Sequence, residues 1–451
     1  MTIGESHPVL PYRGKMRRAH WKTFFSTLIL MMAFSMCVAA PGDLDTSFNG
    51  NGKLILDLPG DSGWIRDIAL QADGKIVAVG WLDTLNPAQA GFIIIRLNAD
   101  GSFDPSFGQG GIVTSGFGYQ FARANSVALQ NDGKLIVGGY AIQSRYATST
   151  QVIIARYLPN GALDTSFHYD GFIEEFTGSF PDGGIYASQA TSVAIQTDGK
   201  IVAVGFGPTE SFVLRYMADG TRDRRFGHLG RAIISLAYGT SAQAVRIQPD
   251  QKLMIVGSFG TFPISNGLAL RLQPHGKFDA SFDSDGYQAI SFGSGLTAKL
   301  DCQIQPDGKL VVVGYYSASE TDPRVLTIAK LNLNGSFDNS FDGVGRVTID
   351  SGGYEGYLFR VAIQQDGKIV VAGSVRATNS SPYNFLLMRR NSDGSPDIGF
   401  GQSGRVETNM SPNADQIHAL RIQPDGRIVA AGFASMEGGR LAIAMARYLG
   451  E

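Results

Sequence analysis

Hydrophobic and polar residues follow one pattern that returns along most of the chain. One segment of the pattern alternates, as in Val127-Ala128-Leu129-Gln130, which is typical of a strand buried on one face. An Asp-Gly pair comes next, followed by a run that is apolar at every position, such as Leu310–Val313. The pattern therefore predicts a half-buried strand, a tight hairpin, and a central strand covered on both faces.

The hairpin aspartates measure the period of this pattern. They are Asp73, Asp132, Asp198, Asp250, Asp307, Asp366 and Asp425, at separations of 59, 66, 52, 57, 59 and 59 residues. Each copy opens with a motif such as Leu44-Asp45-Thr46-Ser47-Phe48 and a short strand. Each copy also has a fourth strand with a basic residue, as Arg96 in Phe92–Leu97. A period of this size indicates one supersecondary unit per copy.

Four strands per copy and seven copies predict an all-β fold, a seven-bladed β-propeller of four-stranded antiparallel blades. A β-solenoid is the competing architecture, but its coils are usually shorter. We expect a single propeller over residues 40–451, with the strand after the Ser-Phe motif innermost. The blades are expected at roughly 52–97, 111–157, 171–216, 230–272, 286–331, 345–389 and 404–448.

Two features bear on the closure and regularity of the ring. The chain ends at Glu451 where a further opening motif would follow, and Leu44–Phe48 supplies that motif near the other end. We therefore expect the two ends to meet in space. In the fourth copy Gln251 replaces the turn glycine. A non-glycine residue at positive φ costs roughly 1 kcal/mol or more, which predicts an altered turn there.

Two paired motifs carry a family resemblance. Leu163-Asp164-Thr165-Ser166-Phe167 and Gln196-Thr197-Asp198-Gly199-Lys200-Ile201-Val202 resemble the delta-60 repeat, a bacterial repeat family assigned to the β-propellers. The resemblance covers essentially all of residues 42–451. It implies a propeller and an exported or surface setting, and it implies no particular enzymatic activity.

The first 39 residues are expected to be a secretory signal peptide. Five basic residues between Arg13 and Lys22 precede an apolar run over Phe24–Ala40 that ends in small residues. A membrane anchor is the rival, but it normally needs about 20 apolar residues. Translation could start at Met1 or at Met16. We expect an exported protein, periplasmic or at the cell surface, without a membrane span after cleavage.

Charge and cysteine content exclude several classes of function. Without residues 1–39 the chain carries 33 basic and 39 acidic residues, a net charge of −6 with no basic run, which argues against a nucleic-acid partner. Cys302 is then the only cysteine, and it occupies an apolar strand position, so we expect a buried hydrophobe. The remaining histidines are far apart and are expected in loops or on the surface: His168, His228, His275 and His418. We expect no metal and no cofactor.

Two aspartates recur in every copy, one in the opening motif and one in the hairpin. Paired carboxylates are the groups of acid–base catalysis. Their sevenfold repetition argues against that role, because an active site normally breaks the symmetry of its scaffold. We expect them to cap turns and to pair with the basic residue of the fourth strand, while the motif Phe packs between blades. No catalytic residue is predicted.

The loops between the first and second strands and between the third and fourth vary most, and both emerge opposite the Asp-Gly turns. Their aromatic residues form the predicted partner-binding face: Trp64, Trp81, Tyr119, Tyr146, Tyr186, Tyr315, Tyr354 and Tyr383. We expect a non-catalytic, monomeric propeller that binds a surface protein or a polysaccharide. The alternative is a hydrolase or lyase at the central channel. It would need non-repeated polar residues to converge there, and the acidic candidates are Glu174, Glu175, Asp182, Asp301, Glu320, Asp322 and Glu355.

Overall fold

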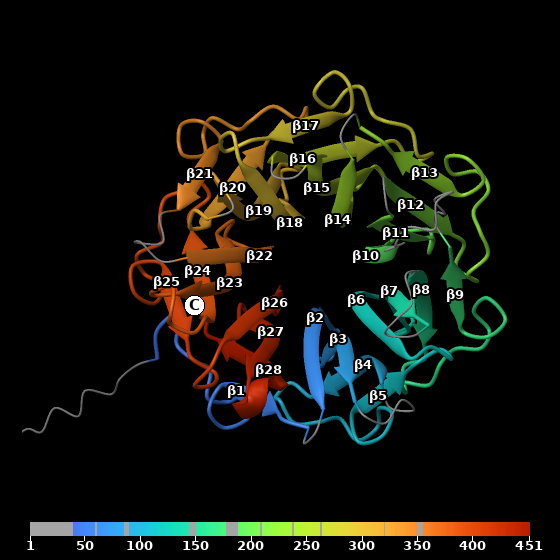
Figure 1. The fold of residues 1–451 in the computed structure, drawn as a ribbon, viewed down its shortest axis with the longest axis horizontal. Helices are drawn as coiled ribbons and strands as arrows, with labels where there is room; N and C mark the ends of the chain where they lie inside the picture. The colour runs from blue at the N-terminus through green and yellow to red at the C-terminus, as the bar shows by residue number, and fades with distance from the viewer. Residues whose placement is uncertain are drawn as a thin grey trace, which may run out of the picture. The chain divides into compact units, whose positions relative to one another are not determined.

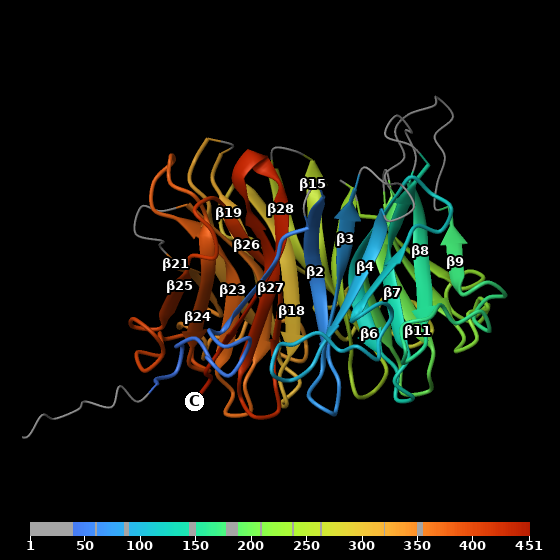
Figure 2. The same cartoon turned by 90° about the horizontal axis from the view of Figure 1, so that it is seen from below.

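The computed structural model describes residues 39–58, 61–84, 90–143, 150–176, 188–207, 210–236, 239–261, 264–319, 321–349 and 355–451. Antiparallel sheets stand side by side in a ring over this part of the chain (Figure 1). Their strands run between the two faces of the ring (Figure 2). Residues 1–38 lie outside the described residues, so the signal peptide stays a prediction.

Five four-stranded sheets and one eight-stranded sheet are found in the described residues. The four-stranded sheets comprise β2 (Ser62–Leu70), β3 (Ile76–Asp83), β4 (Gly91–Leu97) and β5 (Ile112–Ser115); β6 (Phe121–Leu129), β7 (Leu135–Ile142), β8 (Thr150–Tyr157) and β9 (Phe172–Glu175); β10 (Gln189–Ile195), β11 (Ile201–Phe206), β12 (Ser211–Tyr216) and β13 (Arg231–Ile234); β22 (Glu355–Ile363), β23 (Ile369–Arg376), β24 (Asn384–Arg390) and β25 (Arg405–Thr408); and β26 (Asp415–Ile422), β27 (Ile428–Ser435) and β28 (Leu441–Tyr448) with β1 (Lys53–Leu56).

The eight-stranded sheet consists of two meanders joined by one parallel pair, Ser265 with Leu296. Its strands are β14 (Thr240–Ile247), β15 (Leu253–Thr261), β16 (Ile264–Leu272) and β17 (Tyr287–Ile290), then β18 (Leu296–Ile304), β19 (Leu310–Ser317), β20 (Val325–Leu331) and β21 (Arg346–Ile349). A short 3-10 turn, Glu437–Gly439, lies between β27 and β28. No helix in the described part of the chain is long and apolar enough to span a membrane.

The strand after each Ser-Phe motif pairs differently from our expectation. β1 bonds to β28, and β5 bonds to β4, so each such strand completes the preceding sheet. The reason is the motif itself, a tight connection in which Phe107 N bonds to Asp104 O and Gly111 N to Phe107 O, turning the chain back onto β4. The expected strand grouping, 52–97 for the first blade, is therefore wrong by one strand. The sheet runs over 62–115.

The position of that strand in the ring is also corrected. Cavities along the ring axis are lined almost entirely by β2 and its equivalents β6, β10, β14, β18, β22 and β26. These strands, which precede the Asp-Gly hairpins, are innermost. The strands after the Ser-Phe motifs are outermost. The pairing of β1 with β28 brings the ends of the described chain together, as expected.

The repeated polar residues fasten neighbouring sheets. Arg96 Nε donates to Asp104 Oδ2 at 2.8 Å, and its Nη1 donates to the carbonyl of Pro159 in the next sheet. The Arg96 guanidinium lies 4.5 Å from the centre of the Phe107 ring, which is fully buried. The same arrangement recurs for Arg156, Arg215, Arg271, Arg389 and Arg447. The structural interpretation of these aspartates and phenylalanines is confirmed.

The hairpins follow one hydrogen-bond scheme, including the unusual one. Gly308 N donates to Gln305 O at 2.8 Å, with Gly308 at φ 82°. In the fourth copy Gln251 N donates to Gln248 O at 2.8 Å, and Gln251 itself adopts φ 66°. The expected alteration of this turn is therefore wrong: the tight turn is kept and the side chain accepts the left-handed backbone.

The core lies between sheets. One buried cluster joins Val77 and Ile94 of one sheet to Val127, Val137 and Ile153 of the next. Each fully buried aliphatic side chain contributes about 1.5–3 kcal/mol, so these inter-sheet layers hold the ring together. Cys302 is fully buried in the equivalent layer of β18, as expected, and burial raises the pKa of its thiol to about 12.

Candidate functional site

Every innermost strand is interrupted by a β-bulge. The pairing register shifts between Ile65 and Asp67 in β2, and at the matching place in β6, β10, β14, β18, β22 and β26. A bulge leaves a residue out of the ladder and re-aims its side chain. In β18 the shift takes in two residues, Lys299 and Leu300. The ring therefore repeats one local distortion around its axis.

A glycine within the strand that pairs with each innermost strand makes room for the bulge. A Cβ added to Gly80 would lie 1.8 Å from the carbonyl oxygen of Trp64, and one added to Gly373 would lie 1.8 Å from that of Tyr357. No side chain fits at such a separation, because even a methyl group would overlap the oxygen. The repeated glycine and the bulge therefore occur together, because the carbonyl oxygen beside the bulge occupies the space that a side chain would need.

The bulges bring side chains of different chemistry to one place. The bulge residues are Arg66, Asn125, Thr191, Gln243, Leu300, Phe359 and His418, and all of them line a single cavity at the axis. Gln189, Phe206 and Arg360 complete its lining, and its volume is about 120 Å³. A water molecule needs ~10–15 Å³ by this measure, so the cavity has room for several waters or a small ligand group. The backbone is repeated here, whereas the side chains are not.

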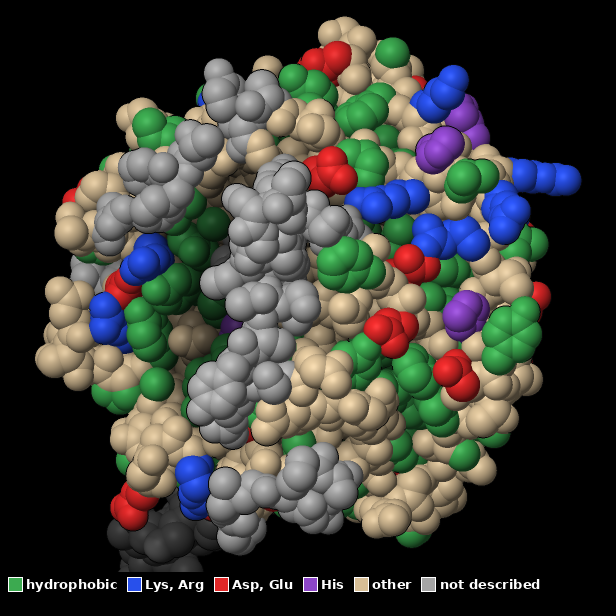
Figure 3. Space-filling model, turned by 45° about the vertical axis from the view of Figure 1, so that its right-hand side comes forward, with side chains coloured by type: hydrophobic (Ala, Val, Ile, Leu, Met, Phe, Trp, Pro, Cys, Tyr) green, Lys and Arg blue, Asp and Glu red, His purple; other side chains and the backbone are tan. Residues whose placement is uncertain are grey.

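The cavity lies toward the variable-loop face. Gln189 is the first residue of β10 and Phe206 the last of β11, and both strands have those ends on the side away from the Asp-Gly turn. A space-filling view of the ring shows a hollow lined by hydrophobic side chains, with basic and acidic side chains beside it (Figure 3). We call the cavity that the seven bulge residues line the upper mouth of the channel.

Aromatic rings form a continuous arc on one side of the upper mouth. The His418 ring lies 4.5 Å from the Trp64 ring and is stacked 4.5 Å from the Phe359 ring. Phe359 in turn stacks on Tyr357, with ring centres 5.6 Å apart. Opposite the arc, β6, β10 and β14 contribute amides and a hydroxyl. A flat apolar wall facing hydrogen-bonding groups is the composition of many small-molecule sites.

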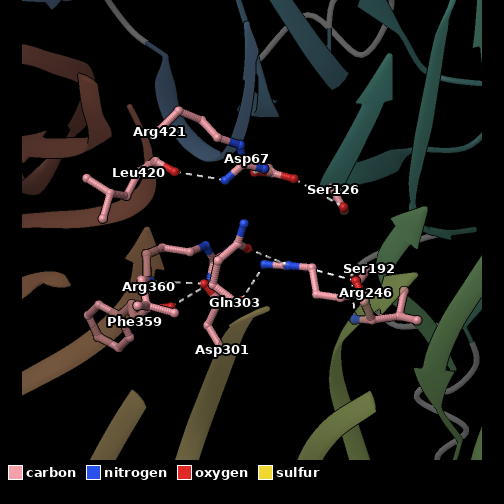
Figure 4. Close-up of polar contacts among 12 residues, drawn as sticks. Asp67, Ser126, Ser192, Arg246, Asp301, Gln303, Phe359, Arg360, Leu420 and Arg421 are labelled. Atoms are coloured by element: carbon pink, nitrogen blue, oxygen red, sulfur yellow. Dashed lines mark hydrogen bonds and ion pairs between the residues drawn. The ribbon is translucent and has the colours of Figure 1, made fainter. Parts of the chain in front are cut away.

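Below the upper mouth, a second polar layer links the sheets (Figure 4). Asp67 Oδ2 accepts hydrogen bonds from Ser126 Oγ and Val127 N, both at 3.1 Å, and Ser126 Oγ accepts one from Val193 N at 3.2 Å. Asp301 Oδ2 likewise accepts from Val361 N at 3.2 Å. Each bond runs from one innermost strand to the next.

Arginines complete this layer where the linking residue is alanine. At Ala244 and Ala419 no polar side chain is available, and an arginine two residues later reaches the next sheet instead. Arg246 Nη2 pairs with Asp301 Oδ1 at 2.8 Å, and Arg421 Nη2 pairs with Asp67 Oδ1 at 2.8 Å. Both carboxylates therefore form ion pairs that join neighbouring sheets.

The guanidinium groups of the upper mouth have no such carboxylate partner among the described residues. Arg66 lies 5.2 Å from the centre of the Trp64 ring, and Arg360 donates to the backbone carbonyls of Phe359 and Arg66. Burial, the charge of Arg360 and the charge of Arg123 lower the pKa of Arg66 to about 10, against a raising effect of Tyr140. By contrast, burial alone would lower the pKa of Arg246, but the charges of Asp301, Cys302 and Asp67 and the hydrogen bond to Asp301 together raise it. The upper mouth is electropositive.

The predicted partner-binding residues are partly brought together. Trp64 and Trp81 lie 5.9 Å apart, and Tyr315 and Tyr383 each contact Tyr357. Tyr119 instead donates to Glu174 near the outer strand β9. Tyr146, Tyr186 and Tyr354 lie outside the described residues.

The acidic candidates of the alternative do not converge. Asp301 alone among those that are described lines the channel. Glu355 pairs with Arg324 and Arg376 and accepts a hydrogen bond from Tyr383 at 2.8 Å. Glu175 pairs with Arg222. Asp182 and Glu320 lie outside the described residues. No three His, Cys, Asp or Glu side chains gather as metal ligands would in the described ranges.

The bulge residues were not predicted from the sequence, and the expected place of His418 is wrong, since it is only 6% exposed and lies on β26. A signal was present. Each bulge residue comes seven positions before its hairpin aspartate, as Arg66 does before Asp73 and His418 before Asp425. Aligned copies vary freely at this position, whereas five positions before the aspartate they are uniformly apolar. The site is therefore marked by a position at which the residue type differs from copy to copy although the backbone conformation repeats.

The comparison with protein families supports the architecture. Residues 71–107, 130–167, 196–226, 305–341, 364–400 and 423–450 match a family described as "Domain of unknown function (DUF5122) beta-propeller". The matches support the expected β-propeller repeat family, although under this description rather than the delta-60 name. They pass over residues 227–304, which include the divergent fourth copy. No curated protein matches the chain.

Several solved structures resemble the chain in fold, although only about one aligned residue in ten is identical. A protein of unknown function from Dyadobacter fermentans is 10% identical, with a TM-score of 0.46, over 89% of this chain and 98% of its own. The polysaccharide lyase Uly1 is 10% identical, with a TM-score of 0.47, over 86% and 90%. An α-L-arabinofuranosidase from Fusarium graminearum is 11% identical, with a TM-score of 0.41, over 72% and 92%.

These findings correct the expected function. We expected a non-catalytic binding module, but the similar structures include a polysaccharide lyase and an α-L-arabinofuranosidase. The upper mouth also holds a histidine and two arginines whose residue types are not repeated from copy to copy, which is the convergence that the alternative required. The expectation of a non-enzymatic protein is therefore not kept.

Proposed function

We propose that the protein is an enzyme that cleaves a polysaccharide, as a hydrolase or a lyase, at the upper mouth of its channel. One observation carries the proposal: a bulge in each of the seven innermost strands presents a side chain to one cavity, and these side chains differ in chemistry. Catalysis needs an asymmetric group of residues. The bulges supply it on a symmetric scaffold without disturbing the packing between sheets.

The chemistry of the lining suits a sugar. The arc of Trp64, His418 and Phe359 gives the upper mouth an apolar side for the C–H groups of a pyranose. The amides of Asn125 and Gln243 both donate and accept hydrogen bonds, as sugar hydroxyls require. His418 is the residue for proton transfer, because imidazole titrates nearest neutral pH.

The test is a screen of polysaccharides with the purified protein, following new chain ends and unsaturated products. His418→Gln should lower turnover by at least about 100-fold, the usual contribution of a general acid or base, and thermal unfolding of the variant shows whether the fold is kept. His275→Gln removes an exposed histidine and serves as the matched control. If the protein cleaves no polysaccharide, or if His418→Gln turns over like the parent, the proposal fails.

The remaining parts of the proposal concern setting and assembly. The described sheets would close as a seven-bladed propeller of delta-60 type. Residues 1–39 would direct export, and the enzyme would act as a monomer in the periplasm or outside the cell. Mass spectrometry of the exported protein, together with its sedimentation, tests the cleavage site and the monomeric state.

A further inference from the structure

The channel carries an excess of positive charge in a chain that is negative overall. The charged residues lining the cavities along the axis are Arg66, Arg246, Arg360, Arg421, Asp67 and Asp301. Four arginines and two aspartates leave a net charge of +2, whereas the whole chain carries −2. A concave site with low-dielectric walls focuses such a field and concentrates anions.

The excess charge lies in the upper mouth. Asp67 and Asp301 neutralise Arg421 and Arg246 in the layer below. Arg66 and Arg360 are left over, and no carboxylate of the described residues lines the cavity they share. The Arg66 guanidinium donates no hydrogen bond to any described residue, and the described bonds of Arg360 go to backbone carbonyls. Guanidinium groups kept close together without a counter-ion are organised for an anion.

We propose, resting on the function proposed above, that Arg66 and Arg360 bind the anionic group of an acidic polysaccharide. A sugar carboxylate and a sulfate ester share the chemistry required: a planar or tetrahedral oxyanion that accepts paired N–H bonds. The Arg66 guanidinium lies over the Trp64 ring and Phe359 lines the same cavity, so the sugar that bears the anion lies beside the aromatic arc. The substrate class is thus acidic rather than neutral.

Binding of a sugar carboxylate by Arg66 and Arg360 also favours one type of cleavage reaction over the other. Hydrolysis by a typical glycosidase uses two carboxyl groups across the scissile bond, and the described lining of the upper mouth has none. A uronic acid permits elimination instead. Imidazole of His418 takes the proton on C5, next to the carboxylate that the arginines neutralise. The electron pair forms the C4–C5 double bond, the C4–O bond breaks, and the leaving oxygen takes a proton from solvent. No water is consumed.

Binding of matched probes by calorimetry tests the proposal. Oligogalacturonate and its carboxyl-reduced neutral form are one pair, and dextran sulfate and dextran are the other, so carboxylate and sulfate are distinguished. The protein should bind at least one anionic probe more tightly than its neutral partner, and added salt should weaken that binding. Arg66→Gln and Arg360→Gln should each weaken it by about tenfold or more. Arg440→Gln, which removes a partly exposed arginine paired with Asp57, should have no effect.

The outcomes separate this inference from the proposed function. Equal binding of charged and neutral probes, or variants that bind like the parent, overturn the acidic-sugar site. Cleavage of neutral polysaccharides alone overturns it too and leaves the proposed function standing. Anionic binding without any cleavage supports the site and defeats the proposed function. A saturated product from oligogalacturonate overturns the elimination step. Because the Arg66 side chain donates no hydrogen bond to a described residue, Arg66→Gln remains a valid test if Arg360→Gln does not fold.

Discussion

Arg421 and Asp67 pair at 2.8 Å although 354 residues separate them in the chain. Arg421 lies on β26 and Asp67 on β2, so the pair joins the last sheet to the first. Asp67 also accepts hydrogen bonds from Ser126 and Val127 on β6. One carboxylate therefore ties three consecutive sheets, at the point where the ring closes.

Replacing Asp67 with alanine should destabilise the protein by about 3 kcal/mol. The change leaves the Val127 N–H and the Arg421 guanidinium without their acceptor in a largely buried layer. Urea unfolding measures the loss. Asp73→Ala, which breaks an exposed pair with Lys75, should cost under about 1 kcal/mol. Similar losses for the two variants would contradict a special role for Asp67.

Replacing Gly80 with alanine should destabilise the protein by more than about 3 kcal/mol or prevent folding. The new Cβ would overlap the carbonyl oxygen of Trp64, and a backbone oxygen in a bulge cannot move without breaking the ladder. Expression yield and thermal unfolding report the effect. Gly438→Ala, where nothing lies within 4 Å of the added carbon, is the control, with a small cost from its positive φ alone. Equal stability of the two variants would show that the bulge tolerates displacement.

Replacing Gln251 with glycine should stabilise the protein by about 1 kcal/mol. Gln251 adopts φ 66° in a turn whose other copies have glycine, and the left-handed backbone costs roughly that amount for a side chain. Lost side-chain hydrogen bonds, such as the one from Thr197 N at 3.3 Å, are long and exposed and offset little of the gain. The midpoint of urea unfolding should rise. A fall would mean that the side chain contributes more than its strain costs.

Acid should weaken the inter-sheet fastenings. Burial raises the pKa of Asp164, but hydrogen bonds from Ser166 and Lys134 and the charge of Arg156 outweigh it and lower the pKa to about 2. A carboxyl group with a lowered folded-state pKa stabilises the fold above its unfolded pKa of 3.8, and this contribution is lost as the pH falls toward about 2.

Ser166→Ala tests this dependence, because it removes one of the hydrogen bonds that lower the pKa. The difference in unfolding free energy between the parent and the variant should be largest above about pH 4 and should shrink toward about pH 2. A difference independent of pH would mean that the hydroxyl acts only through packing and its bond to Arg156.

The repeat unit could be predicted from sequence because its signals are local. Asp-Gly hairpins, apolar central strands and the Ser-Phe motif each depend on a few neighbouring residues, and sevenfold repetition averages out exceptions such as Gln251. Strand grouping could not be obtained in the same way. Whether the strand after Phe107 pairs backward with β4 or forward depends on the hydrogen bonds of the motif, and either choice gives the same periodicity.

The candidate site was hidden for a related reason. A search for repeated chemistry finds residues that maintain the ring, such as Asp104 and Arg96. His418 and Arg66 share no motif, and the bulge that brings them together distorts the backbone without adding any polar residue to the pattern. The uniform glycine opposite the bulge and the variation at the bulge position are the sequence signals of the bulge, but glycine in a strand also marks tight bends and close backbone approaches where no bulge exists.

The bulges of the seven innermost strands have a consequence for how such a protein acquires specificity for a ligand. A chain built by duplication of one gene segment begins with seven equal copies, and its channel would begin with one residue type all round. A single codon per copy, the one seven before the hairpin aspartate, then supplies seven of the ten side chains that line the upper mouth. Mutation at these codons can explore new substrates while every codon that maintains the ring stays unchanged.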